Sequence, residues 1–219
     1  MTFIRLEQVE KSFGKTRVLR GLNVSIAEKE QVAIRGASGS GKSTLLYLLG
    51  GLDQPTSGKV IINNKNISAM GDEDLARFRN ESVGFVFQFH FLLPSMTCRD
   101  NILLPARIGG RNLAQVEKDI SKLSEYLGVN HCLEKYPFEI SGGEQQRINI
   151  IRALSLRPKI LLCDEPTGNL DSKNSEKVTT LLKNLTTDFN ATLLVVTHDD
   201  KVASHFPRKI VIEDGQIIG

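Results

Sequence analysis

The stretch GASGSGKS, residues 36–43, decides the fold. It fits the phosphate-binding pattern G-x-x-x-x-G-K-[ST]. The apolar residues 32–34 precede it and helix-forming residues 44–49 follow it, which is the strand–loop–helix context that the pattern requires. Its glycines allow positive φ and a close backbone approach, so that N–H groups and a helix N-terminus can face a phosphate. We therefore predict nucleotide binding here, against the alternative of a glycine-rich turn with a chance Lys-Ser.

The residue types within this stretch suit ATP and Mg²⁺. Lys42 supplies a point charge for the β- and γ-phosphates, and the Ser43 hydroxyl is a hard oxygen ligand for Mg²⁺. The expected nucleotide contacts are Gly36, Ala37, Ser38, Gly39, Ser40, Gly41, Lys42, Ser43 and Thr44.

Strand and helix signals alternate on both sides of the loop. Strands are expected over 3–9, 22–27, 31–34, 60–63, 83–87, 160–163, 192–196, 209–213 and 216–218, the last two flanking an Asp214-Gly215 hairpin turn. This order predicts an α/β fold: a P-loop core with a mostly parallel sheet and an antiparallel β portion.

The middle of the chain shows almost no strand signal. Val116, Ile120, Leu123 and Leu127 fall at helical spacing on one face, with Asn112 as an N-terminal cap beside Gln115 and Gly128 as a stop. We expect one domain over 1–219, in which 1–90 and 157–219 form the α/β core and 91–156 form an inserted helical subdomain.

Bulk properties narrow the function classes. The 219 residues carry 28 basic and 25 acidic side chains, a net charge of +3, which does not argue for nucleic acid. No apolar run reaches the roughly 18 residues that span a bilayer, and the first ten residues lack the apolar region of a signal peptide. Cys98, Cys132 and Cys163 are far apart and show no metal-ligand spacing. We expect a protein of the cytosol or of the cytosolic face of a membrane.

An acidic pair follows the apolar run 160–163. In a P-loop protein a carboxylate at a strand end near the phosphates holds Mg²⁺, usually through water, which we assign to Asp164. Glu165 points differently and is placed to orient or activate a water. The alternative is a loop acid or helix cap, which the P-loop disfavours.

The residues SGGEQ, 141–145, precede a helix. Ser141 and Glu144 make a capping box, which needs no ligand. Gly142 and Gly143 are not explained by a cap, because glycine in a helix costs about 1 kcal/mol relative to alanine. An anion bound at this helix N-terminus explains them. Since the P-loop already holds phosphates, we expect this second site, Ser141, Gly142, Gly143 and Glu144, to contact nucleotide held by another subunit.

This stretch, between the P-loop and Asp164-Glu165, resembles the signature of ABC-transporter nucleotide-binding domains, and the resemblance covers essentially the whole chain. The resemblance implies that Glu165 is the catalytic base and that His198 contacts the γ-phosphate. It also implies that Phe13 stacks on adenine and that Gln88 touches Mg²⁺ and senses the partner. Residues 168–171, with Asp171, would cross the dimer interface. Without it, Phe13 reads as core, Gln88 as a polar strand end and His198 as a surface residue. Ile151 departs from the small residue common at its position.

Residues 45–53 and 87–94 narrow the resemblance to the lipoprotein-releasing ATPases, within a group that includes macrolide-export and cell-division ATPases. It implies a head-to-tail dimer with a second copy and an integral-membrane subunit, at the cytoplasmic face of the inner membrane. Phe89, Phe91, Leu92 and Leu93 are equally compatible with core packing and with a socket for that subunit. The rival interpretations are a soluble ABC ATPase without a membrane partner and another P-loop enzyme, such as a GTPase or small-molecule kinase.

Overall fold

The computed structural model describes residues 2–168 and 170–218, and its centre is a sheet with strand order β10-β9-β3-β8-β7-β6. Neighbours from β9 to β6 run parallel, and β10 closes an antiparallel hairpin with β9. All residues of β7 and β8 are buried, as expected for parallel strands covered on both faces. The strands span Gln31–Arg35 (β3), Val83–Phe87 (β6), Ile160–Asp164 (β7), Thr192–Val196 (β8), Arg208–Glu213 (β9) and Gln216–Ile217 (β10).

A second, antiparallel sheet has the order β2-β1-β4-β5. Its strands span Thr2–Phe13 (β1), Thr16–Ala27 (β2), Ser57–Ile62 (β4) and Lys65–Asn66 (β5). β1 and β2 are longer than the expected 3–9 and 22–27, because register shifts after Leu6 and after Val9 interrupt the alternation that the sequence pattern follows. Phe13 consequently lies at the end of a long hairpin.

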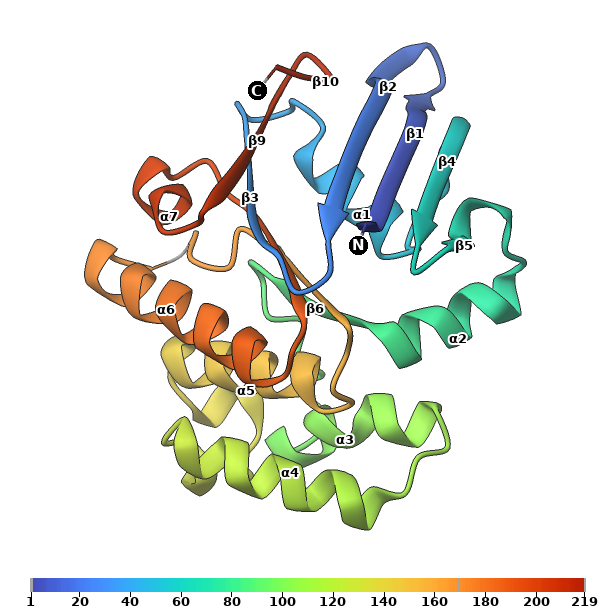
Figure 1. Ribbon diagram of the computed structural model, residues 1–219. Coiled ribbons are helices and arrows are strands. Elements are labelled where there is room, and N and C mark those ends of the chain that lie inside the picture. The colour runs from blue at the N-terminus through green and yellow to red at the C-terminus, as the bar shows by residue number, and fades with distance from the viewer. Residues whose placement is uncertain (1, 169, 219) are drawn as a thin grey trace.

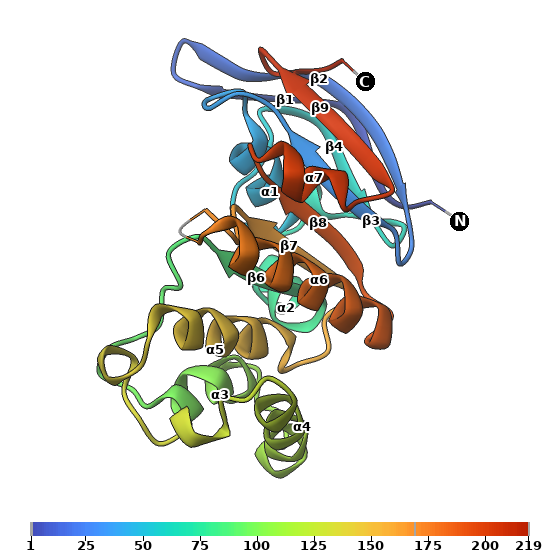
Figure 2. The same cartoon turned by 90° about the vertical axis from the view of Figure 1, so that its left-hand side faces the viewer.

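Helices cover the parallel sheet on both faces (Figures 1 and 2). α1 (Lys42–Leu49) packs between the two sheets, and its leucines join one continuous core with both. The other face packs against α3 (Cys98–Ile108), α4 (Leu113–Tyr126), α5 (Gly142–Leu154) and α6 (Ser172–Asp188). The predicted class, a P-loop α/β fold with an antiparallel β portion, is confirmed.

The helix α4 begins and ends where the sequence predicts. Asn112 caps α4 by accepting a hydrogen bond from the Ala114 N–H, and Gly128 has φ 66° just beyond its end. One core runs from these helices to the sheet, so Ile120 and Leu161 belong to the same buried cluster. The boundaries 91–156 stay a prediction.

Two helices had no sequence prediction: α2 (Asp72–Ser82) and α7 (Asp200–Ser204). In α2 only Leu75 is buried, so no apolar stripe marks it. Short 3₁₀ turns cover Ile67–Ala69 (η1), Asn130–Cys132 (η2) and Pro137–Glu139 (η3). Among the described helices, none has the length and apolar content that crossing a membrane requires.

Candidate active site

The loop 36–43 joins β3 to α1, as its pattern predicts. Gly41 is the N-cap of α1 with φ 103°, and a Cβ there would lie 2.6 Å from Leu19 Cδ2. At Gly36 a Cβ would lie 2.2 Å from the carbonyl oxygen of Ile212. Only glycine therefore fits either position, as expected for a loop whose backbone must approach a phosphate closely.

Lys42 lies inside this loop. It is buried, and its ammonium donates to the carbonyl oxygens of Gly36 and Ala37 at 2.9 and 2.8 Å. Within the described residues, the buried Ser40 Oγ has no hydrogen-bond partner. A buried ammonium held only by carbonyls and an unpaired hydroxyl both favour an anionic ligand in this loop. The residues present fit a phosphate chain.

Oxygen ligands for Mg²⁺ meet beside Lys42. Ser43 Oγ donates to Asp164 Oδ1 at 3.0 Å, and the Tyr47 hydroxyl donates to Asp164 Oδ2 at 3.3 Å. Burial and the charge of Asp164 both raise the pKa of Tyr47. A carboxylate and a hydroxyl at the phosphate loop are the hard oxygen donors that Mg²⁺ takes in proteins, so the donor set fits this ion. Tyr47 was not foreseen, because the pairing spans 117 positions of chain.

Glu165 and His198 form a pair at the ends of β7 and β8. His198 Nδ1 lies 2.8 Å from Glu165 Oε1. Glu165 has φ 47°, an unusual conformation for a non-glycine residue, and its N–H donates to the carbonyl of Val196. Because β7 and β8 are adjacent and parallel, their carboxyl ends bring both side chains together, where open α/β sheets bind ligands.

Gln88 directly follows β6. It therefore lies at the same edge of the sheet as the carboxyl ends of β7 and β8. A Cβ at Gly168 would lie 2.8 Å from Gln88 Nε2, so the amide lies against the loop that leaves Glu165. A hollow of about 290 Å³ joins Gln88 to the start of α5 and the start of α6, lined among others by Gly142, Gly143, Pro166 and Asp171. The structure thus brings Gln88, the two glycines and Asp171 to one place.

Asp171 has a structural role in this chain. Its Oδ1 accepts from the Asn174 N–H at 2.9 Å and caps α6, and this hydrogen bond lowers the pKa of its carboxyl. The expected dimer-crossing stretch 168–171 includes Asn169, which lies outside the described residues.

Ser141 and Glu144 form the expected capping box. Ser141 accepts from the Glu144 N–H, and Glu144 Oε2 accepts from the Ser141 N–H at 2.8 Å. These contacts with Ser141 hold the pKa of Glu144 at about 2. A Cβ at Gly142 would meet nothing within 4 Å, and at Gly143 it would meet only the end of Arg147. Packing within this chain therefore does not require either glycine.

Phe13 ends β1, and the other strand of its hairpin, β2, passes next to the phosphate loop. Its ring is 54% exposed, and the Lys11 ammonium lies 4.8 Å from the ring centroid. The returning strand β2 carries Val18 and Leu19, which are the neighbours that a Cβ at Gly41 would meet. The sequence alternative of a core phenylalanine is wrong, because more than half of the ring is exposed to solvent.

The four aromatic and aliphatic residues after Gln88 divide between the two alternatives. Leu92 packs against the core, whereas Phe89, Phe91 and Leu93 are 64%, 63% and 40% exposed. Arg152 was not foreseen: its guanidinium donates to the carbonyls of His90 and Phe91 and so fixes this loop on α5.

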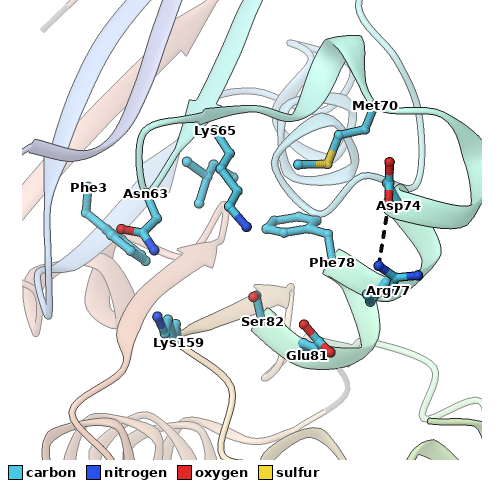
Figure 3. Close-up of a pocket in the computed structure, with 11 residues that line it drawn as sticks. Phe3, Asn63, Lys65, Met70, Asp74, Arg77, Phe78, Glu81, Ser82 and Lys159 are labelled. Atoms are coloured by element: carbon cyan, nitrogen blue, oxygen red, sulfur yellow. Dashed lines mark ion pairs between the residues drawn. The ribbon is translucent and has the colours of Figure 1, made fainter.

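A larger hollow of about 470 Å³ lies beside α2 and the start of β7 (Figure 3). Phe3, Met70 and Phe78 line it, with Lys159 from the segment that enters β7. It faces the amino ends of the parallel strands, so it is separate from the site at their carboxyl ends.

A phosphate loop between β3 and α1, with Asp164 beside Ser43, defines the class of P-loop nucleotide-binding proteins. The family described as "ABC transporter" matches residues 19–168, and the chain belongs to this family as an ABC ATPase. Membership excludes the interpretations as a GTPase or a small-molecule kinase.

Relatives match nearly the whole chain. Proteins described as "Lipoprotein-releasing system ATP-binding protein LolD" from Cytophaga hutchinsonii and Geobacter metallireducens are 46% and 47% identical to it, over 98% and 94% of this chain and 98% and 92% of theirs. The dimeric structure of a bacterial ABC transporter cassette is similar with a TM-score of 0.90 and 38% identity, over 99% of this chain and 97% of that one. A dimeric post-hydrolysis structure of that cassette, bound to ADP and Pi, has a TM-score of 0.87.

Proposed function

We propose that this chain is the ATPase of a lipoprotein-releasing transporter, in which ATP closes a dimer of two copies and a membrane subunit uses that motion. The main support for a dimer that shares its nucleotides is the position of Gly142 and Gly143. A Cβ at either would meet at most the end of Arg147. They begin α5, which lies on the opposite face of the parallel sheet from α1, the helix that follows the phosphate loop (Figure 2). The lipoprotein substrate rests on the names of the relatives.

In the proposed cycle each ATP lies between the phosphate loop of one copy and Ser141–Gly143 of the other, head to tail. ATP favours the closed dimer because it binds that state more tightly. Lys42 offsets charge on the β- and γ-phosphates, and Ser43, Asp164 and Gln88 hold Mg²⁺, which supplies further charge stabilisation when bound. Phe13 stacks on the adenine of the bound nucleotide.

Glu165 accepts a proton from the attacking water, and His198 positions Glu165 and faces the γ-phosphate. The 2.8 Å contact between them supports this division of work. Once the γ-phosphate is cleaved, the contact that bridges the two copies is lost and the dimer opens.

Asp164→Asn should separate nucleotide binding from Mg²⁺-dependent turnover. The amide keeps the hydrogen bond from Tyr47 but removes the charge that holds the ion, so we expect hydrolysis at limiting Mg²⁺ to fall at least about tenfold. Phosphate release titrated with MgCl₂ measures this, and binding of a fluorescent ATP analogue in EDTA should change little. An unchanged Mg²⁺ dependence would remove Asp164 from the metal site.

The membrane subunit would dock on an apolar groove between α3 and β6. Phe85, Phe87, Leu104 and Ile108 line it, and Ile108 is 74% exposed. Phe91 packs edge-on against Phe87 at 5.3 Å between ring centroids, which continues the apolar surface toward Gln88. A groove beside the γ-phosphate side of the site suits a partner's cytosolic helix. In this proposal the chain works as a peripheral subunit at the cytoplasmic face of the membrane, and nucleic acid has no role.

Ile108→Glu tests the docking surface. A charge on the exposed groove wall should abolish co-purification with the membrane subunit from detergent extracts, while basal ATPase activity stays within about twofold because surface changes away from buried features are mild. Tyr126→Glu on α4 is the matched control, since Tyr126 is also well exposed, at 64%, and lies outside the groove. If the wild-type chain retains only soluble partners, the alternative of a soluble ABC ATPase holds.

A further inference from the structure

A cluster of metal-ligating side chains lies apart from Asp164 and Ser43, where the turn η2 meets the start of α5. In the described part of the chain, His131, Cys132 and Glu144 are the one group of three such residues with ligand atoms all within 4.8 Å of one another. His131 Nε2 lies 2.9 Å from Glu144 Oε1 and 3.4 Å from Cys132 Sγ. Sequence spacing does not reveal this group, because Glu144 follows Cys132 by twelve positions.

The separations suit a single small ion. Ligands around tetrahedral Zn²⁺ lie about 2.0–2.3 Å from the metal, and so about 3.3–3.7 Å from one another. The contacts at 2.9 and 3.4 Å need to open by only about half an ångström to admit it. Imidazole, thiolate and carboxylate are also the three ligand types that zinc takes together.

Glu144 can ligate without giving up its role in the helix cap. Its Oε2 accepts from the Ser141 N–H and from Ser141 Oγ at 2.8 and 2.6 Å, which leaves Oε1 directed at His131. A ligand oxygen oriented by other hydrogen bonds is the arrangement that tunes metal sites.

Backbone contacts hold Cys132 in place. Its N–H donates to Val129 and its carbonyl accepts from Lys135, so the side chain is fixed toward the imidazole and the carboxylate. Burial, followed by the hydrogen bond and charge of Glu144, raises the pKa of the thiol to about 11. The thiol is therefore protonated without metal, and binding transfers one proton from sulfur to the buffer as the S–metal bond forms.

We propose that His131, Cys132 and Glu144 form a binding site for Zn²⁺ or a similar borderline divalent cation, with water completing the coordination through the exposed side of His131. The His131 side chain is 58% exposed, which provides the entry path, whereas Cys132 is fully covered. The ion would join the turn at 130–132 to the first turn of α5. It is separate from the Mg²⁺ ligands Asp164 and Ser43, but it adjoins the proposed second ATP contact, because Glu144 also bonds Ser141.

Titration of the tag-free full chain with CoCl₂ and ZnCl₂, without nucleotide, tests the site. We expect one Co²⁺ per chain with a near-ultraviolet thiolate charge-transfer band that Zn²⁺ displaces, and a higher melting temperature with Zn²⁺. Cys132→Ser should abolish the band, and His131→Ala should weaken Zn²⁺ binding at least about tenfold. His131 is exposed, so that variant keeps its fold and remains informative if Cys132→Ser does not fold.

Two controls separate this site from other ligands of the chain. Cys98→Ser removes a second buried thiol whose pKa is also about 11, and should leave the band unchanged. A Glu165→Gln, His198→Ala double variant removes the other histidine–carboxylate pair and should also keep it. Persistence of the band in Cys132→Ser, unchanged affinity in His131→Ala, or loss of binding in the double variant would each overturn the proposal.

Discussion

Replacing Glu165 with glutamine should lower ATP hydrolysis about 10²–10⁴-fold and leave an ATP-bound dimer that persists through size-exclusion chromatography. Glutamine preserves the size of the side chain and can still accept a hydrogen bond at the position where His198 Nδ1 now lies 2.8 Å away. It cannot take a proton from water. Binding and dimer closure would therefore proceed while the step that opens the dimer stalls.

The measurements are phosphate release and the elution volume in the presence of ATP and Mg²⁺. Glu125→Gln is the matched control, since it makes the same change on the exposed face of α4 and should behave as wild type. A Glu165→Gln protein that remains monomeric and hydrolyses normally would remove Glu165 from the role of base.

The chemistry of the nucleotide site could be predicted from the sequence because its parts are local. The phosphate loop needs only a strand, glycines and a helix in order, and residues 36–43 carry that order themselves. The ends of β7 and β8 were also predictable. Two largely apolar runs lead to Asp164-Glu165 and to His198, and in a parallel sheet their carboxyl ends lie at one edge.

The features that could not be predicted from the sequence depend mostly on contacts between distant parts of the chain. The hydrogen bond of Tyr47 to Asp164 has no local pattern, and Tyr47 otherwise reads as part of an apolar helix. α2 was missed because its single buried residue gives no periodicity. Arg152 was missed for another reason: a basic residue near a helix end usually faces solvent, whereas here burial lowers the pKa of its guanidinium and two loop carbonyls hold it.

Gly142→Asp should leave folding intact and reduce hydrolysis about 10²-fold or more. The structure gives a reason for both expected effects, the intact fold and the loss of hydrolysis. A side chain at residue 142 meets open space, so no clash destabilises α5. A carboxylate in the first turn of a helix adds about 0.3–1 kcal/mol of favourable interaction with the helix dipole. The same carboxylate would occupy the place proposed for the phosphates of the nucleotide held by the other copy, and like charges repel there.

A stability gain together with an activity loss is what distinguishes a nucleotide contact from a helix cap. If the glycines served only this chain's own fold, Gly142→Asp would lower the melting temperature and hydrolysis in parallel. Gly71→Asp controls for the substitution itself, because Gly71 also opens to empty space at the start of a helix, α2, and should leave hydrolysis unchanged. ATP-driven dimerisation of Gly142→Asp in the Glu165→Gln background, followed by size exclusion, then locates the loss: a dimer that still forms would mean that residue 142 does not contact the second nucleotide.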